Sequence, residues 1–206
     1  DHIIIVNDNS QDNTAAIVQL HVQSSNGRVI LLDLNKNQGV GGAIAEGYRW
    51  SRDHEIFATA VMAGDAQMDP SDLSSLLDPI IDKEADYVKG NRLISGEAWK
   101  IIPKSRYMGN AALSLLTKIA SGYWHIADSQ TGYTVANLSV LQTIDLEKIY
   151  KKYGVPNDIL VKLNIYSFRV KDVEIKPIYN IGEKSGIKPI LVIPKFSWLL
   201  LKLFIY

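Results

Sequence analysis

Cysteine is absent from this sequence of 206 residues, and histidine is scarce. The lack of thiols excludes disulfides, zinc-thiolate sites and cysteine nucleophiles. The four histidines, His2, His21, His54 and His125, show no spacing typical of metal ligands. Any bound metal would therefore be held mainly by oxygen atoms, which favours hard divalent cations.

The sequence also lacks an overall excess of charge of either sign. Lys and Arg together number 22, as do Asp and Glu. Net charge therefore gives no indication of nucleic-acid binding, and we expect no nucleic-acid partner. The two signs are unevenly distributed, because residues 1–146 carry a net charge of −6 and residues 147–206 a net charge of +6. A basic end on an acidic body indicates an anionic partner, such as a membrane surface.

The C-terminal segment is apolar, but its apolar run is too short to indicate a membrane-spanning helix clearly. Of the 17 residues from Ile190 to Tyr206, 13 are apolar, with Pro194 and Lys195 among the interruptions. A spanning helix needs about 20 mostly apolar residues. We therefore expect residues 188–206 to form a basic, apolar juxtamembrane or interfacial helix. A helix that packs into the protein core is the alternative.

Short apolar segments alternate with amphipathic ones along the first part of the chain. This order predicts an α/β fold with a mostly parallel sheet and helices on both faces. The expected strands cover residues 3–6, 29–33, 57–62, 87–89 and 169–175, and the expected helices cover residues 12–24, 43–52, 71–83, 105–121 and 158–165. Ligands of such sheets bind beyond the carboxyl ends of the strands, so the polar clusters that follow the strands are expected to converge on one crevice.

Two of these clusters have the composition of tight turns as well as of ligand-binding loops. Asp8, directly after the first strand, can accept hydrogen bonds from a base or a ribose, although a turn and a helix cap explain the same residue types. In residues 37–43, glycines let the backbone approach an anion at a helix N-terminus. A tight strand-to-helix turn explains them equally well. The spacing matches neither the dinucleotide fingerprint nor a P-loop.

Residues 64–70 carry a stronger signal for a metal. Asp65 and Gln67 lie two positions apart on an extended turn, so their side-chain oxygens can share one hard cation such as Mg²⁺ or Mn²⁺, with substrate phosphates completing the shell. Asp69 is expected to cap the next helix, with Pro70 at or near the first helical position. That structural role accounts for Asp69 and not for Asp65.

Two charged residues are expected beside the same crevice. Arg92 ends the fourth strand and places a cation there. Asp128 follows the long helix in a loop rich in Gly and Tyr, where a carboxylate serves as a base or orients an acceptor. A capping or loop hydrogen bond is the alternative for Asp128.

In this order, the segments resemble the family 2 glycosyltransferases of the GT-A fold, particularly the polyprenyl-phosphate branch that includes dolichol-phosphate-mannose synthase. The resemblance covers roughly residues 1–187, and the ordered set is more specific than any single piece. The matching pieces are residues 5–14 for V-D-D-G-S-x-D-x-T, residues 37–43 for N-x-G-x-x-x-A, residues 64–70 for D-x-D-x-Q-x-x-P, residues 90–92 for G-x-R, and residues 128–133 for D-x-Q-x-G-[FY].

The resemblance implies nucleotide-sugar chemistry. It implies that Asp8, Asn37 and Gly39 bind the donor, and that Asp65 and Gln67 hold the Mg²⁺ or Mn²⁺ that bridges the donor diphosphate. Breaking the sugar–phosphate bond leaves a nucleoside diphosphate, so stabilisation of negative charge should dominate catalysis.

Three further roles follow from the same resemblance. Arg92 would neutralise phosphate charge, and Asp128 would be an acceptor-side base or positioning group. Lys184, in the loop over residues 182–186, would clamp a phosphate.

The departures from the family pattern are also informative. Ala63 stands where the first Asp of D-x-D usually lies, so the metal site has one carboxylate fewer. Asn7 replaces the first Asp of the D-D pair. The family's first strand and its V-I-P-x-[YF]-N-E segment are missing. We therefore expect residues 1–187 to be an N-terminally truncated GT-A catalytic domain that lacks the first strand of its sheet.

The leading functional hypothesis is an inverting glycosyltransferase of cell wall biogenesis. It would move a sugar from a UDP- or GDP-type donor to a polyprenyl phosphate or a cell-surface glycan at the cytoplasmic face of a membrane. A nucleotidyltransferase is one alternative, but it would be expected to show a Gly-rich basic loop after its first strand, and that region is missing. A non-catalytic sugar-nucleotide-binding module is the other, and Ala63 favours it.

Overall fold

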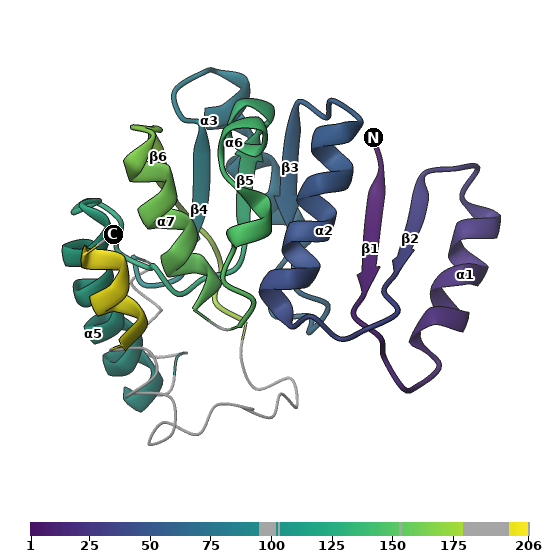
Figure 1. The fold of residues 1–206 in the computed structure, drawn as a ribbon, viewed down its shortest axis with the longest axis horizontal. Coiled ribbons are helices and arrows are strands. Elements are labelled where there is room, and N and C mark those ends of the chain that lie inside the picture. The colour runs from purple at the N-terminus through teal and green to yellow at the C-terminus, as the bar shows by residue number, and fades with distance from the viewer. Residues whose placement is uncertain (95–101, 103, 153, 179–197, 206) are drawn as a thin grey trace. The chain divides into compact units, whose positions relative to one another are not determined.

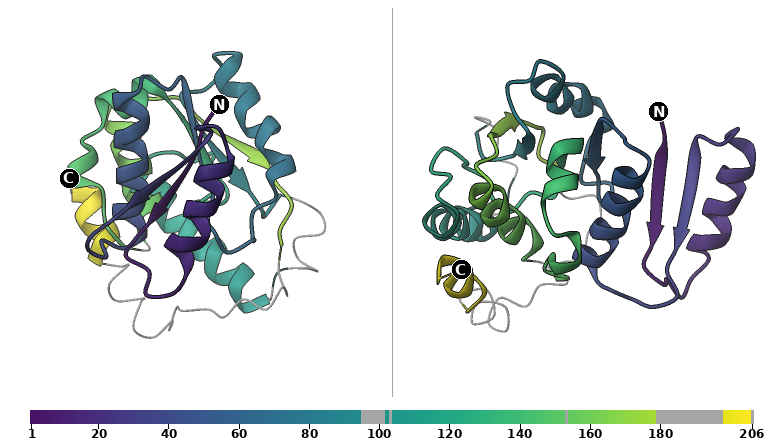
Figure 2. Two further views of the ribbon diagram at one scale, coloured as in Figure 1. Left: turned by 90° about the vertical axis from the view of Figure 1, so that its right-hand side faces the viewer. Right: turned by 45° about the horizontal axis from the view of Figure 1, so that its top comes forward.

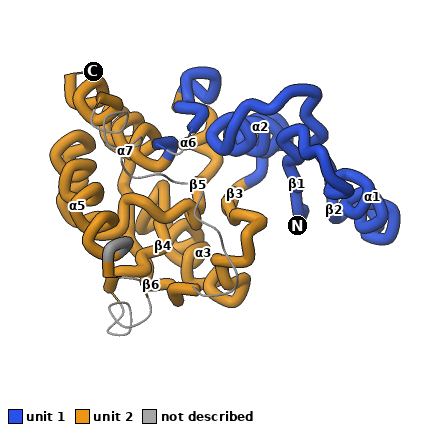
Figure 3. The backbone as a smooth tube through the Cα atoms, turned by 90° about the horizontal axis from the view of Figure 1, so that it is seen from below, with its two compact units in different colours: residues 1–56, 145–155 blue, residues 57–144, 156–206 orange. Residues whose placement is uncertain are grey.

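The computed structural model describes residues 1–94, 102, 104–152, 154–178 and 198–205 (Figure 1). The chain forms two compact units (Figure 3). The first comprises residues 1–56 and 145–155, and the second comprises residues 57–144 and 156–206. The sequence does not predict this division, which arises because residues 145–155 return to the first unit.

The first unit contains a parallel pair of strands and two helices. Strands β1 (Ile3–Asn7) and β2 (Val29–Asp33) pair in register from Ile3 opposite Val29 to Asn7 opposite Asp33. Helices α1 (Thr14–Ser24) and α2 (Val40–Asp53) pack against β2 and β1 respectively (Figure 2). A short 3₁₀ helix, η2 (Leu146–Lys148), lies against α2. The apolar runs predicted from the sequence form both strands.

The second unit contains a four-stranded sheet in the order β3-β5-β4-β6 (Figure 1). Its strands are β3 (Ala58–Val61), β4 (Tyr87–Asn91), β5 (Thr134–Asn137) and β6 (Val170–Glu174). Strand β5 is antiparallel to both β3 and β4, and β4 is parallel to β6. The carboxyl ends of β3, β4 and β6 therefore lie at the same sheet edge as the segment that enters β5.

Helices flank this sheet and bury its apolar side chains. The helical elements are η1 (Pro70–Asp72), α3 (Leu73–Ile81), α5 (Lys104–Ser121), α6 (Leu138–Thr143), α7 (Val155–Ile165) and a helix over residues 198–205. Leu76 and Ile80 of α3 are buried against Val88 of β4 and Val135 of β5. Burial of these aliphatic side chains fixes α3 on the sheet.

The α/β class predicted from the sequence is confirmed, but the strands form a two-stranded and a four-stranded sheet rather than one. The expected strands are present as β1, β2, β3, β4 and β6, but β5 and the adjoining helix α6 are not predicted. β5 has only four residues, and its first three are fully buried, so it shows no alternation of apolar and polar residues. In the four-stranded sheet, β3, β4 and β6 run in one direction and β5 runs antiparallel to them.

Candidate active site

In the first unit, Asp8 is bound to the turn before α2. Its Oδ1 accepts a hydrogen bond from the amide of Gln38 at 2.6 Å, and its Oδ2 accepts one from the amide of Gly39 at 2.8 Å. The side chain of Asn37 donates to the carbonyl of Asp8 at 3.0 Å. The three residues that we predicted to bind the donor, Asp8, Asn37 and Gly39, thus form one network at a helix N-terminus, where negative charge is favoured.

The glycines of this turn are explained by a close approach of the backbone. Gly39 has a φ of +79°, and a Cβ atom there would lie 2.4 Å from the carbonyl oxygen of Lys151. A Cβ atom on Gly41 would lie 1.9 Å from the carbonyl oxygen of Tyr150. The amide of Gly41 also donates to the carbonyl of Lys151 at 3.1 Å. These contacts hold residues 145–155 in the first unit and support the turn explanation for both glycines.

We expect Gly41→Ala to destabilise the chain, because its methyl group would overlap the backbone at Tyr150. Overpacking of this kind costs about 1–3 kcal/mol of unfolding free energy, as chemical denaturation would measure it. Gly109→Ala is the matched control, since Gly109 lies inside α5 and a Cβ atom there would meet nothing within 4 Å. That variant should be stabilised by about 0.5–1 kcal/mol. Equal effects at both positions would contradict the close approach at Gly41.

In the second unit, the loop after β3 carries the predicted metal ligands. Oδ1 of Asp65 accepts a hydrogen bond from the amide of Gln67 at 3.0 Å, and the Asp65 side chain is exposed. Nε2 of Gln67 donates to the carbonyl of Ile178, beyond β6, at 3.4 Å. Asp69 caps η1 as predicted, because its Oδ1 accepts from the amide of Ser71 at 2.9 Å.

The donor atoms of this loop fit a hard divalent cation. Since Nε2 of Gln67 is engaged by Ile178, Oε1 of Gln67 and the carboxylate of Asp65 are the oxygens available to a metal. Within the described residues, no cluster of three or more His, Asp or Glu side chains could hold a metal by itself. A cation bound here would take few protein ligands and complete its shell with substrate oxygens.

Arg92 and Asp128, both predicted from the sequence, form a bidentate pair. Nε of Arg92 donates to Oδ2 of Asp128 at 2.8 Å, and Nη2 donates to Oδ1 at 3.1 Å. Asp128 is fully buried, whereas 20% of the Arg92 side chain is exposed. Burial opposes ionisation of Asp128, but the charge and hydrogen bonds of Arg92, with help from Lys89, hold its pKa below the usual range. The pair is therefore ionised at neutral pH.

The loops that carry these residues meet at one edge of the sheet. The hydroxyl of Tyr133 donates to the carbonyl of Asp69 at 3.2 Å, which joins the loop after β3 to the start of β5. Arg92 follows β4 directly and binds Asp128, a few residues before β5. Gln67 reaches the segment after β6. Within the second unit, these contacts bring the loops to one edge of the sheet, and their convergence on a ligand-binding crevice stays a prediction.

Sequence reasoning missed two charged residues next to this pair, one buried and one partly buried. Lys89 of β4 is fully buried, and Asp172 lies opposite it on β6. The sequence signal for Lys89 is a cation inside an otherwise apolar strand, flanked by Val88 and Gly90. A strand buried on both faces leaves a charged side chain no route to solvent, so it must find partners inside the protein. The predicted phosphate clamp Lys184 lies outside the described residues.

The fold is of the GT-A type that solved glycosyltransferases show. The fold resembles that of glucosyl-3-phosphoglycerate synthase from Mycobacterium tuberculosis, solved with Mn²⁺, UDP and glucosyl-3-phosphoglycerate, with a TM-score of 0.62 and 15% sequence identity. The match covers 98% of this chain and 67% of the synthase. The chain belongs to glycosyl transferase family 2, whose sequence profile matches residues 1–145.

Two curated relatives act on lipid phosphates, as their names state. UDP-N-acetylglucosamine–dolichyl-phosphate N-acetylglucosaminyltransferase from Methanococcus voltae is 30% identical over 191 residues, which covers 87% of this chain and 76% of the relative. Undecaprenyl-phosphate mannosyltransferase from Micrococcus luteus is 29% identical over 174 residues, with 84% and 70% covered.

Proposed function

We propose that this chain is the catalytic part of an inverting glycosyltransferase that moves a sugar from a UDP- or GDP-type donor to a polyprenyl phosphate at the cytoplasmic face of a membrane. One observation carries the proposal. The loop with Asp65 and Gln67 meets the loop with Asp128, which is held by Arg92, at a single sheet edge. The lipid-phosphate acceptors named for both curated relatives support the choice of acceptor.

The residues of this edge suit the departure of a nucleoside diphosphate. Asp65 and Gln67 would hold a divalent cation, which would supply positive charge at the leaving diphosphate. Arg92 contributes a preorganised guanidinium whose partly exposed surface faces the solvent side of the pair. Asp8 and the turn at Gly39 form the donor-binding network of the first unit, where Asp8 fixes the backbone amides and Asn37 fixes the loop.

Asp128 suits a positioning role better than a role as base. Both of its oxygens are engaged by Arg92, and its pKa lies below the ordinary range, so it is a weak proton acceptor. A phosphate monoester acceptor is already an anion and needs little help from a base. We therefore propose that Asp128 fixes the guanidinium of Arg92 in the orientation that meets the donor diphosphate.

A donor and acceptor screen tests this function. The full-length protein is assayed against a panel of UDP- and GDP-sugars with a polyprenyl phosphate and Mg²⁺ or Mn²⁺, and nucleoside diphosphate and lipid-linked sugar are measured. Release of nucleoside diphosphate coupled to lipid glycosylation is the expected result. Release of pyrophosphate would indicate nucleotidyl transfer, and binding of sugar nucleotide without turnover would indicate a binding module.

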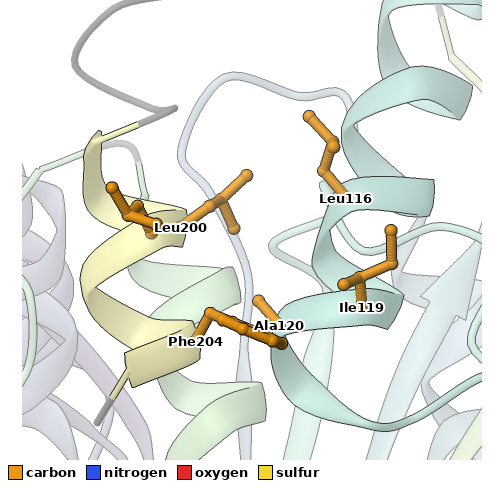
Figure 4. Close-up of a pocket in the computed structure, with 6 residues that line it drawn as sticks. Leu116, Ile119, Ala120, Leu200 and Phe204 are labelled. Atoms are coloured by element: carbon orange, nitrogen blue, oxygen red, sulfur yellow. The ribbon is translucent and has the colours of Figure 1, made fainter.

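We further propose that the second unit contacts the membrane through α5 and the helix over residues 198–205. These helices line an apolar groove of about 230 Å³ (Figure 4). Within the described residues, none of the helices has the length and apolarity needed to cross a bilayer. Exposed apolar side chains and a nearby cation suit an interfacial helix. The exposed residues on these helices include Leu116, Ile119, Trp198, Leu201, Phe204 and Ile205, and Lys202 lies 5.3 Å from the Trp198 ring centroid.

Replacing Leu201 and Phe204 with serine should weaken binding to anionic vesicles. Each fully buried apolar side chain contributes roughly 1.5–3 kcal/mol to transfer from water, so we expect partition to fall by about tenfold or more. Ile17→Ser with Leu20→Ser is the matched control, because these α1 side chains are 55% and 66% exposed. Vesicle co-sedimentation measures both pairs, and equal partition of the two double variants would contradict the membrane role of the C-terminal helix.

A further inference from the structure

The buried ammonium group of Lys89 binds the loop that carries Asp128. Nζ of Lys89 donates a hydrogen bond to the carbonyl of Thr131 at 2.9 Å. The Lys89 side chain is fully buried, at the centre of a sheet where β5 lies on one side of β4 and β6 on the other. Burying an ammonium is costly unless it is compensated by charge and hydrogen bonds. The chemistry proposed for the site gives this buried ammonium no role, so its position needs a separate explanation.

Asp172 binds the other end of the same loop. Its Oδ2 accepts hydrogen bonds from the amide of Ala127 at 2.6 Å and from the side chain of Asn91 at 2.7 Å. Lys89 and Asp172 are register partners on neighbouring strands, β4 and β6. The buried Lys89 and the partly buried Asp172, of opposite charge, thus hold residue 131 and residue 127, which flank Asp128.

The charges around Lys89 balance. The charged groups that face it are Asp128 from the loop, Asp172 from β6 and Arg92 from the end of β4, and its partner on β5 is the uncharged Thr134. Burial lowers the pKa of Lys89 to about 8, while the two carboxylates oppose this effect. Burial likewise raises the pKa of Asp172. Loss of the Lys89 proton would leave two carboxylates facing one guanidinium.

We propose that Lys89 is a positioning residue for sugar transfer, whose buried ammonium holds the loop over residues 127–131 and thereby sets the geometry of the Asp128–Arg92 pair. This inference rests on the proposed function, since it concerns the same site. Lys89 does not contact the donor or the acceptor in this scheme. It acts through the loop and through the charge balance around Asp128.

Lys89→Met tests the proposal, because methionine fills a similar volume without charge or donor. We expect kcat to fall by about 10²-fold, the effect of a displacement of about 1 Å in a catalytic geometry, with a smaller change in the KM for sugar nucleotide. The kcat of the wild-type protein should also fall as pH rises through about 8, and this alkaline limb should be missing from the variant. Lys171→Met is the matched control, because Lys171 is exposed on β6 and pairs with Glu84.

Amide hydrogen exchange gives a readout that does not depend on activity. In Lys89→Met, protection of the amides of Ala127, Ser129 and Gln130 should fall at least tenfold, while the amides of β1 and β2 keep their protection. If the single variant does not fold, Lys89→Met with Asp172→Asn, which removes the charges of both residues, is measured instead. In that double variant too, kcat and loop protection should be low, because the hydrogen bond to Thr131 is absent.

The outcomes separate this proposal from the proposed function. Unchanged loop protection in the variant would overturn the positioning role. The positioning role would also be overturned if the variant lost loop protection but kept a normal kcat and an unchanged alkaline limb. A wild-type protein that transfers no sugar from any donor would defeat the proposed function, while loop exchange in the same samples would still decide whether Lys89 holds the loop.

Discussion

Replacing Asp65 with asparagine is expected to lower kcat/KM for sugar transfer by about 10²–10³-fold, the loss typical of removing one group that stabilises transition-state charge. Asp65 is the carboxylate of the loop after β3 that does not cap η1, and Ala63 takes the place of the family's other Asp. Asparagine keeps an oxygen of the same reach but removes the negative charge that balances the metal. Asp65→Ala, which also removes the oxygen, should abolish transfer that depends on the donor.

Asp69→Asn is the matched control in the same loop. Asp69 caps η1 through its Oδ1, and asparagine is an equally good cap, so activity and stability should change little. Diphosphate release is measured over a range of Mn²⁺ and Mg²⁺ concentrations for both variants. An Asp65→Asn protein with full activity, or with an unchanged requirement for the metal, would defeat the assignment of Asp65 as a metal ligand.

The motifs place the candidate residues of the second unit at the correct sheet edge, because the motifs follow the ends of strands. Asp65, Arg92 and Asp128 are far apart in sequence, yet each lies next to the end or the start of a strand of one sheet. Parallel strands bring their carboxyl ends to one edge, so strand order alone is enough to group such residues. The side-chain contacts do not follow from this rule, which is why the sequence left Asp128 open between a base and a positioning group.

The sequence pattern does not distinguish the two possible roles of Asp8. The sequence gives it two explanations, a ligand contact and a turn hydrogen bond, and residues of its type serve both. The structure engages both carboxylate oxygens with backbone amides of the turn before α2. A carboxylate oxygen accepts more than one hydrogen bond, so this network is compatible with donor binding. Its role in donor binding stays a prediction.

Lys89 was missed for a different reason. In an analysis of hydrophobic periodicity, a lysine counts as a solvent-facing position. A strand of five residues is too short for its pattern to show that the lysine is buried. All five residues of β4 are buried, so the lysine lies inside the protein. The division into two units was missed because it depends on residues 145–155, whose contacts with Gly39 and Gly41 are made by backbone atoms that leave no sequence pattern.

Removing the carboxylate of Asp128 is expected to cost about 3 kcal/mol of unfolding free energy, because loss of one partner of a buried ion pair typically costs 3–5 kcal/mol. Asp128→Ala leaves the guanidinium of Arg92 and the ammonium of Lys89 without their shared carboxylate. Asp53→Ala, which breaks an exposed pair with Arg52, is the control and should cost less than about 1 kcal/mol. Chemical denaturation measures both variants.

The pH dependence of this stability has a definite sign. The pKa of Asp128 in the folded protein lies below its usual value, so the pair's contribution is fully present above an unfolded-state pKa of about 3.9. It is lost as pH falls through the lower folded value. The difference in unfolding free energy between wild type and Asp128→Ala should therefore be constant near neutral pH and shrink below about pH 4. A difference that stayed constant well below pH 4 would contradict an ionised, Arg-paired carboxylate.

Kinetics of the pair then separate positioning from base catalysis. If Asp128 acts through Arg92, Asp128→Asn and Arg92→Met each lower kcat by about 10²-fold, and the double variant is scarcely worse, because residues that act as a unit are not additive. If the two residues had independent roles, the fold-losses in kcat of the single variants would multiply in the double variant. A base would also make the loss in Asp128→Asn larger than the loss in Arg92→Met, and it would give wild-type kcat an acid limb that the variant lacks. Because both oxygens of Asp128 are engaged by Arg92, we expect the first pattern.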